Sequence, residues 1–393
     1  MAYFTTRPST GAHFLQLPGP SNVPDRVLRA MDHATMDHRG ADFGVFTTQL
    51  LGKLKAVFKT ERPVMIYPAS GTGAWEAALV NTLSPGDVVL MCRTGWFAHL
   101  WQEMAQRLGL VPEFIDTDWR SGADVAAIGA ALAADASHRI KAVAVVHNET
   151  STGCTSDIAA VRAALDAARH PALLLVDTIS GLGSIDYRHD EWGVDVTVSG
   201  SQKGLMLPPG LSFNVASAKA MEASRTARLQ RSYWDWAPML AANATGYFPS
   251  TPATNLLYAL DTAIDMLMEE GLENVFARHD RFAEATRRAV SAWGLETQCA
   301  VPARASNVLT AVRVPEGHSA DALRAAIVEK FDMSLGNGLG QLKDRVFRIG
   351  HLGHLSPLQL VGTLGGVEMG LRACNIPHRP GGTQAALEYL AGN

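Results

Sequence analysis

One lysine is set apart from the other charged residues around it. Lys203 is the only charged residue between Asp195 and Lys219, and it lies in a glycine-rich turn that follows an apolar run. Burial lowers the pKa of an ammonium group, and the neutral amine is the nucleophile that Schiff-base chemistry needs. The alternative is a loop lysine whose amine extends into solvent. The surrounding residues favour a buried, reactive amine.

A carboxylate at the end of a second apolar run is the next candidate. Asp177 follows the sequence Leu-Leu-Leu-Val at 173–176. At the carboxyl end of a buried parallel strand, such a side chain faces the crevice in which these sheets bind ligands. The sequence Asp-Thr-Ile-Ser is also suitable for a helix N-cap. The residue pattern therefore leaves both roles open.

A turn of small residues could bind a phosphate. The sequence Ser-Gly-Thr-Gly at 70–73 follows a short apolar run and precedes a helix that we expect to begin at Ala74. Backbone N–H groups and a helix N-terminus together favour an anion at such a turn. The turn has neither the Gly-Lys-Ser/Thr ending of a Walker loop nor the spacing of a dinucleotide fingerprint.

These three segments belong to a repeated pattern of apolar run, turn and helical stretch over about residues 62–215. The expected strands are 64–67, 88–92, 111–115, 142–147, 173–177, 194–199 and 211–216, and the expected helices are 74–83, 97–109, 124–135 and 157–169. Several runs are continuously apolar, which is typical of strands buried on both faces. We therefore predict an α/β fold with a mostly parallel sheet covered by helices.

The pattern changes after residue 250. Two long helices are expected at 254–270 and 272–293, followed by a strand, helix, strand and helix at 308–314, 320–331, 346–349 and 357–372. A chain of 393 residues also exceeds the roughly 250–300 residues at which single cores stop growing. We predict an extended N-terminal arm at 1–22, a large domain at 23–268 and a small α+β domain at 269–393.

Composition excludes several classes of protein. The net charge of −4 and the absence of a long basic run argue against a nucleic-acid partner. No apolar stretch approaches the roughly 20 residues of a membrane helix, and the N-terminus does not resemble a secretory signal, so we expect a cytoplasmic protein without membrane contact. The four cysteines show no metal-ligand spacing, so we expect no metal and free thiols.

Ordered motifs along the chain resemble the class V aminotransferases, a branch of the type I pyridoxal phosphate enzymes. The resemblance runs from about Leu17 to Arg372. The motifs that carry it are Pro-Gly-Pro-Ser-Asn at 18–22, Ser-Gly-Thr-Gly-Ala-Trp-Glu at 70–76, Asn-Thr-Leu-Ser-Pro-Gly-Asp at 81–87, His-Asn-Glu-Thr at 147–150, Asp-Glu-Trp-Gly-Val-Asp at 190–195, Gly-Ser-Gln-Lys at 200–203, Gly-Leu-Glu-Asn at 271–274 and Phe-Arg-Ile-Gly-His-Leu-Gly at 347–353. An aromatic segment, Tyr-Trp-Asp-Trp at 233–236, is similar to a motif of the glyoxylate-using branch.

The resemblance implies pyridoxal 5'-phosphate as the cofactor and assigns residues to it. Lys203 would bind the cofactor as a Schiff base and transfer protons during catalysis, and Asp177 would bind its pyridine nitrogen. The other implied cofactor-binding residues are Ser70, Gly71, Thr72 and Gln202 at the phosphate, Thr150 at the ring oxygen, Phe97 and Ile179 at the two ring faces, and Thr251 contributed by the partner subunit of a homodimer. Phe97 and Ile179 are also compatible with an ordinary core.

For the substrates, the resemblance implies small amino acids and 2-oxo acids. Arg348 would bind their carboxylate, because a guanidinium can bind a planar carboxylate through two hydrogen bonds. Without the resemblance, Arg348 would be interpreted as a surface charge. We expect the 18–22 loop, with Gly19 and Asn22, to line the same pocket, and His38 to reach it across the dimer unless it is a surface residue.

The expected reaction is transfer of the amino group of L-serine to glyoxylate, with alanine or aspartate as alternative donors. A desulfurase or lyase is a remote alternative, because a desulfurase needs a mobile-loop cysteine and residues 331–353 contain none. A catalytically inactive relative is the other alternative, and the presence of Lys203, Asp177 and Gln202 argues against it.

Overall fold

The computed structural model describes residues 11–392. The strands of the larger sheet are β2 (Val64–Tyr67), β3 (Val88–Arg93), β4 (Val111–Asp116), β5 (Ile140–Val146), β8 (Leu173–Asp177), β9 (Val196–Gly200) and β10 (Ser212–Ala216). The strands of the smaller sheet are β1 (Phe14–Gln16), β11 (Glu296–Thr297), β12 (Leu309–Arg313), β13 (Met333–Asn337) and β14 (Val346–Gly350). A hairpin of β6 (Asn148–Glu149) and β7 (Cys154–Thr155) stands apart from both sheets.

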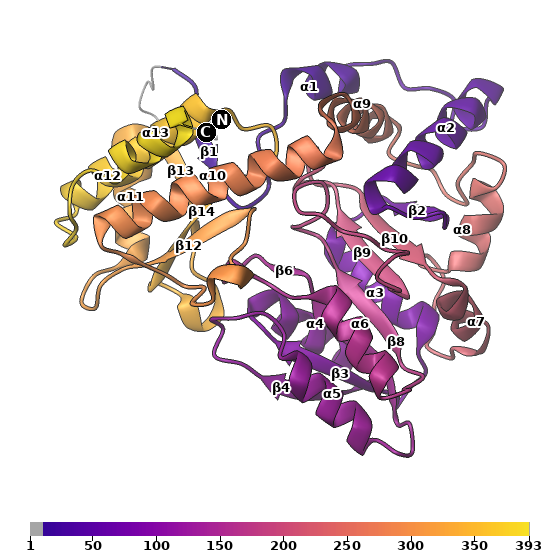
Figure 1. Cartoon of the computed structure of the whole chain (residues 1–393). Helices are drawn as coiled ribbons and strands as arrows, with labels where there is room; N and C mark the ends of the chain where they lie inside the picture. The colour runs from indigo at the N-terminus through magenta and orange to yellow at the C-terminus, as the bar shows by residue number, and fades with distance from the viewer. Residues whose placement is uncertain (1–10, 393) are drawn as a thin grey trace.

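Helices cover both sheets (Figure 1). The N-terminal helices are α1 (Asp25–Met31), α2 (Ala41–Phe58), α3 (Gly71–Thr82), α4 (Trp96–Arg107), α5 (Val125–Ala134), α6 (Ile158–Ala167), α7 (Ala218–Thr226) and α8 (Trp236–Asn243). The C-terminal helices are α9 (Thr254–Glu270), α10 (Leu272–Trp293), α11 (Ala320–Phe331), α12 (Pro357–Ala373) and α13 (Gly382–Gly392). Two 3₁₀ turns, η1 (Pro302–Arg304) and η2 (Gly340–Leu342), complete the described elements.

The larger sheet is mixed, and all but one of its strands are parallel. Its order is β2-β10-β9-β8-β5-β3-β4, in which β10 runs antiparallel to both of its neighbours. Alternate residues of β8 belong to different cores, since Leu174 and Val176 pack on one face whereas Leu173 and Leu175 pack on the other. This burial on both faces explains the continuous apolar runs, and the predicted α/β class is confirmed.

The smaller sheet has the order β1-β13-β14-β12-β11 and its own core. Its first strand comes from the N-terminus, because Phe14 and Gln16 pair in parallel with Met333 and Leu335. The chain then passes through residues 17–24 into the helices that cover the larger sheet. The N-terminal segment therefore joins the two halves of the molecule.

The second connection between the two halves is the junction of α9 and α10. Gly271 caps both helices and has φ +83°, a backbone conformation that favours glycine. Beyond it, α10 extends from the larger part of the molecule along the small-sheet part (Figure 1). The predicted division of the chain at 268/269 lies close to this junction and stays a prediction, as does the assignment of residues 1–22 as an arm, of which 1–10 lie outside the described residues.

Several expected boundaries differ from the structure. The phosphate-turn helix begins at Gly71 rather than at Ala74, because the backbone of Ser70 is extended and the following small residues already turn into α3. Pairings distant in sequence form β1 and β13, and tertiary packing forms α2 and α13, none of which the sequence pattern predicted. Within residues 11–392, no helix combines the length and apolarity needed to span a membrane, and no three potential ligands cluster in a way that could hold a metal ion.

Candidate active site

Most of the candidate residues lie at the carboxyl ends of the strands of the larger sheet. Asp177 ends β8, Lys203 lies in the turn after β9, and Ser70 lies in the turn after β2. Thr150 follows β6 just beyond the end of β5, and Phe97 lies in the first turn of α4 after β3. Because these strands run in the same direction, their carboxyl ends form a single edge, which is where α/β sheets bind ligands.

Lys203 is buried and its amine is enclosed. The residue is 8% exposed, and Nζ donates a hydrogen bond to the carbonyl oxygen of Pro18. Desolvation and the charge of Arg348 together lower the pKa of Lys203 to about 7, while the charge of Asp177 opposes the shift. The sequence-based expectation of a buried amine with a lowered pKa is confirmed, and an extended surface lysine is excluded.

Gly19 makes this enclosure possible. A Cβ built at Gly19 would lie 2.3 Å from Lys203 Nζ, and the backbone there has φ +102°. Ser21 fixes the same loop from the other side, because its Oγ donates to the carbonyl oxygen of Lys203 over 2.9 Å. The Asn22 side chain donates to Leu15 O, so its amide nitrogen holds the loop itself.

Asp177 is buried with two donors aimed at its carboxylate. Ile179 N donates to Oδ1 over 2.6 Å, and Trp75 Nε1 donates to Oδ2 over 2.9 Å. Burial is the main cause that raises the pKa of Asp177 to about 7; the charge of Glu149 adds to this rise, and the two hydrogen bonds and the charge of Lys203 oppose it. Asp177 therefore accepts a hydrogen bond within its own turn and lies within electrostatic range of Lys203, and the helix N-cap interpretation was wrong, because no helix begins directly after β8 in the described chain.

Arg348 is in the interior, so its interpretation as a surface charge was wrong. It lies on the central β14 strand of the small sheet and is 6% exposed. Its Nε donates to Asn337 O and its Nη1 donates to Thr150 O, over 2.7 and 2.8 Å. Burial lowers the pKa of Arg348 to about 10. Two of the five guanidinium N–H groups are thus used for orientation, and the remainder can bind a carboxylate.

The turn at Ser70 has the properties of an anion site. No side chain caps the first turn of α3, so its N–H groups are free of the usual Ncap partner. The Gln202 Oε1 atom is buried and has no hydrogen-bond partner among residues 11–392. Ser70 and Thr72 are exposed beside it. A Cβ at Gly71 would lie 2.3 Å from Ile179 Cδ1, so any larger residue there would displace Ile179 or the turn.

These features fit pyridoxal phosphate. A phosphate fits the uncapped α3 terminus, and a protonated pyridine nitrogen fits the buried Asp177 carboxylate. The aldehyde fits a buried amine with a lowered pKa, which Lys203 provides. Phe97 and Ile179 are partly buried members of one apolar cluster, as residues that cover a ring would be.

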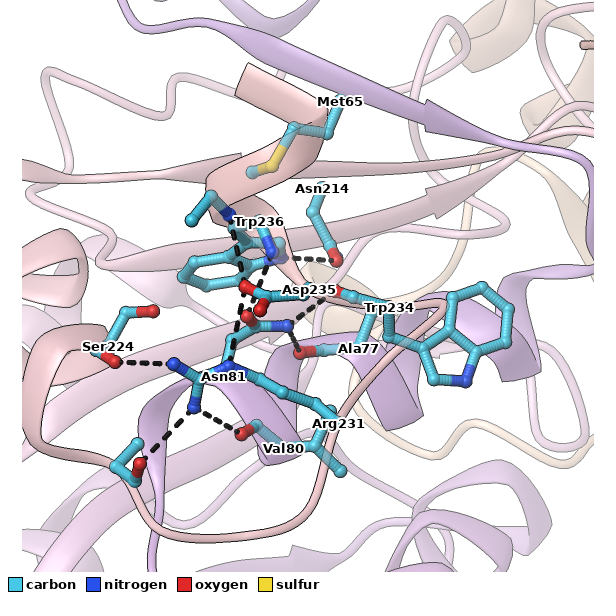
Figure 2. Close-up of polar contacts among 12 residues, drawn as sticks. Met65, Ala77, Val80, Asn81, Asn214, Ser224, Arg231, Trp234, Asp235 and Trp236 are labelled. Atoms are coloured by element: carbon cyan, nitrogen blue, oxygen red, sulfur yellow. Dashed lines mark hydrogen bonds and ion pairs between the residues drawn. The ribbon is translucent and has the colours of Figure 1, made fainter. Parts of the chain in front are cut away.

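The aromatic segment at 233–236 lies behind the phosphate turn. A Cβ at Gly73 would be 2.6 Å from Trp234 Cη2, so the indole packs directly on that turn. Figure 2 shows how Asn81 of α3 holds the segment: its amide nitrogen donates to Trp234 O over 2.7 Å, and its Oδ1 accepts from Trp236 N over 3.1 Å. Arg231 adds bonds to backbone carbonyls of α3 and α7. The described contacts of the segment thus support the turn.

Two predicted residues lie apart from the others within the single chain. His38 is partly buried in the turn before α2, and Thr251 is exposed in the loop before α9. Neither forms a hydrogen bond or an ion pair with Lys203, Asp177 or Arg348 in the described part of the chain. Their predicted roles require a partner subunit.

A buried amine, a carboxylate at a strand end and an oriented guanidinium, on a seven-stranded mostly parallel sheet with a second small sheet, define the aminotransferase class of type I pyridoxal phosphate enzymes. Residues 13–338 match the model of the family "Aminotransferase class-V". The chain therefore belongs to the class V aminotransferases, and it is a transaminase that uses pyridoxal phosphate.

Named relatives agree with this family. The chain is 50% identical to serine–glyoxylate aminotransferase of Methylorubrum extorquens, over 99% of this chain and 98% of that one. It is 47% identical to L-aspartate–glyoxylate aminotransferase of Paracoccus denitrificans, over 95% of each chain. Among solved structures, alanine–glyoxylate aminotransferase from Nostoc sp. superposes with a TM-score of 0.85 at 30% identity, covering 94% of this chain and 98% of that chain.

Three residues that contact the site were not predicted from the sequence. Trp75 and Glu149 stand inside quoted motifs, and Ser21 stands in the 18–22 loop. A tryptophan in the first turns of a helix and a glutamate after an apolar strand were the available signals. Neither pattern predicts the hydrogen-bond partner of the side chain, because the partners come from segments that are distant in the sequence.

Proposed function

We propose that this chain transfers the amino group of L-serine to glyoxylate and forms hydroxypyruvate and glycine. The observation that carries the proposal is the convergence of Lys203, Asp177 and Arg348, whose charges interact across the two sheets. The 50% identical relative named for serine and glyoxylate supports the choice of substrates. In a ping-pong cycle, hydroxypyruvate would leave before glyoxylate binds the same site.

Arg348 would bind the carboxylate that all four substrates and products share. Its guanidinium is already oriented by Asn337 and Thr150, so little rotamer freedom is lost when an anion binds. Because this carboxylate is common to donor and acceptor, Arg348 serves both halves of the reaction. The Gly19 and Asn22 loop would cover the substrate from the side of Lys203.

Lys203 would move the proton. Pyridoxal phosphate, when bound, supplies an electron sink that stabilises the negative charge developing at the donor Cα. With a pKa near 7, the Lys203 amine can take the proton from the serine Cα and return one to the Cα of glycine. Asp177 would keep the pyridine nitrogen protonated, and Ser70, Gly71, Thr72 and Gln202 would bind the phosphate.

The remaining predicted residues would complete the site. Thr150 would bind the ring oxygen, while Phe97 and Ile179 would cover the ring faces. Thr251 would reach the phosphate of the partner subunit in a homodimer, and His38 would approach the partner's substrate. The exposure of Thr251 and the partial exposure of His38 on one chain are compatible with these roles. The cytoplasmic location also stays a prediction from the sequence.

Aspartate is the second candidate donor, because a relative named for aspartate and glyoxylate is 47% identical. Alanine is the third, supported by the similar solved structure. The three donors share the carboxylate and amine and differ beyond Cβ. The residues described above contact the shared groups and therefore do not separate the three.

Comparison of kcat/KM for the three amino donors tests the choice of serine. Purified holoenzyme would be assayed with L-serine, L-alanine and L-aspartate, each at a fixed saturating glyoxylate concentration. We expect kcat/KM for serine to exceed the other two by about tenfold or more, because a pocket that binds a hydroxyl rejects analogues that lack it. A tenfold preference for alanine or aspartate would contradict the proposal. The variant Arg348→Lys is the control, because it should lower all three constants by a similar factor.

A further inference from the structure

The first turn of α4 depends on another segment of the chain for its capping. A helix begins with N–H groups that have no partner within the helix. In α4 these belong to Trp96, Phe97 and Ala98, while the N–H of His99 already bonds Gly95 O. The Ncap residue is Gly95, which has no side chain to accept from them. Their partners therefore come from elsewhere in the fold.

Glu149 and Ser151, at the β6–β7 hairpin, supply these partners. The Glu149 carboxylate accepts from Phe97 N over 3.3 Å and from Ala98 N over 3.1 Å. Ser151 Oγ accepts from Trp96 N over 2.9 Å and donates to Glu149 Oε1 over 2.6 Å. Ser151 N donates to the same Oε1 over 3.0 Å. One carboxylate thus joins the hairpin to the helix.

The surroundings are built for this carboxylate. Glu149 is completely buried, at 0% exposure. A Cβ at Gly95 would lie 2.4 Å from Glu149 Cγ, so glycine is required for the two segments to meet. A charge this deep is tolerated only when it is paired and hydrogen-bonded. Burial raises the pKa of the Glu149 carboxyl, and the four donated hydrogen bonds oppose that shift. The charges of Glu149 and Arg348 also interact favourably.

We propose that Glu149 is a positioning residue that fixes the first turn of α4 and thereby holds the Phe97 ring against the cofactor. The inference rests on the proposed role of Phe97 at the ring face. Phe97 is the residue whose own N–H the carboxylate binds, so the position of its Cα depends directly on Glu149. The same hairpin carries Thr150, so α4 and Thr150 are held in one fixed arrangement.

The test is the variant Glu149→Gln, which keeps the size of the side chain. Its amide has one acceptor oxygen, and its NH₂ group would face an N–H donor of α4. We expect the dissociation constant of pyridoxal phosphate, measured by titrating cofactor-free protein and following absorbance, to rise about tenfold. The visible circular dichroism of the bound cofactor should fall, because the ring would be held in a less fixed orientation. Asp124→Asn, which alters the Ncap residue of α5, is the matched control and should change neither value.

A double-mutant cycle separates positioning from general stability. In a Phe97→Ala background, Glu149→Gln should weaken cofactor binding by less than about twofold, because the ring that Glu149 positions is absent. An undiminished tenfold loss in that background, or a single variant with unchanged cofactor affinity, would overturn the inference. If Glu149→Gln does not fold, Ser151→Ala provides the test, with a smaller loss of affinity expected and the same non-additivity with Phe97→Ala. These binding measurements involve no amino donor, so they do not depend on whether serine is the substrate.

Discussion

The amine of Lys203 has a lowered pKa because of where the N-terminal loop lies. Pro18 and Gly19 lie directly against the amine, and water is excluded from it. Arg348 adds a like charge, which disfavours the ammonium form further. The same arginine that would bind the substrate carboxylate thus helps to keep Lys203 neutral.

The rate at which cofactor-free protein captures pyridoxal phosphate should therefore depend on pH near neutrality. Only the neutral amine attacks an aldehyde, so the rate should rise with pH, with a midpoint near the Lys203 pKa of about 7. Asp177, also with a pKa of about 7, ionises over the same range and acts in the same direction. Stopped-flow absorbance across about pH 5.5–9 measures this rate. A rate that is still rising without a midpoint at about pH 9, as for an exposed lysine with a pKa of about 10.4, would contradict the assignment.

The variant Arg348→Lys tests how the substrate carboxylate is bound. Arg348→Lys keeps a positive charge but loses the planar fork, including the bonds to Asn337 and Thr150. We expect KM for both serine and glyoxylate to rise about tenfold or more, because bidentate carboxylate binding is lost. Steady-state kinetics on each substrate checks this. An effect on one substrate alone would show that Arg348 does not bind the group they share.

At the scale of the element, the turn at the start of α3 depends on close packing. Ile179 lies two residues after Asp177, the last residue of β8, and its side chain packs against Gly71. It therefore connects the turn at Ser70 with the end of the strand that carries Asp177. Trp234 packs on Gly73 from behind. The turn is thus held between two neighbours, so an added methyl group should shift it.

Gly71→Ala tests this packing. The new Cβ would lie 2.3 Å from Ile179 Cδ1, so we expect pyridoxal phosphate affinity to fall about tenfold through displacement of Ile179 or the turn. Gly365→Ala, in the interior of α12, is the matched control, because a Cβ there meets no atom within 4 Å. That variant should keep its cofactor affinity and unfold at a slightly higher temperature. Equal affinities for the two variants would contradict the packing argument.

The local sequence pattern was sufficient to predict strands and helices that have a strong apolar pattern. It was insufficient for elements that form only by packing or pairing with segments distant in the sequence. The buried runs of β2 and β8, and the long helices α9 and α10, were predicted with their observed bounds. The start of α3 was misplaced because glycine disfavours helices in isolation, whereas here packing decides. The burial of Arg348 could not be inferred from its neighbours in sequence, because the guanidinium meets Thr150, which lies 198 residues away along the chain. The resemblance to a family, rather than periodicity, placed it in the site.

The proposed homodimer shares its active sites between subunits, and dimers that combine two different inactive variants test this. Lys203→Ala removes the amine of its own site, and Thr251→Glu should repel the phosphate of the partner's site. Co-expressed, the two inactive variants should regain about a quarter of wild-type activity, because half of the dimers are mixed and each has one intact site. Activity of the separately purified variants and of the tagged mixed dimer would be compared. No recovery in a mixed dimer of confirmed composition would show that Thr251 does not act across subunits.

The N-terminal strand has a consequence for how the chain is made. His13, beside β1, bonds Asp332, which is 319 residues further along the chain. A ribosome releases the N-terminus first, so β1 must wait until β13 (Met333–Asn337) has been synthesised before its partner strand exists. Until then the loop that encloses Lys203 has no anchor on the small sheet. The amine should therefore acquire its enclosed state only after β13 has been synthesised, and cofactor capture by shorter nascent chains should be slower than by the folded enzyme.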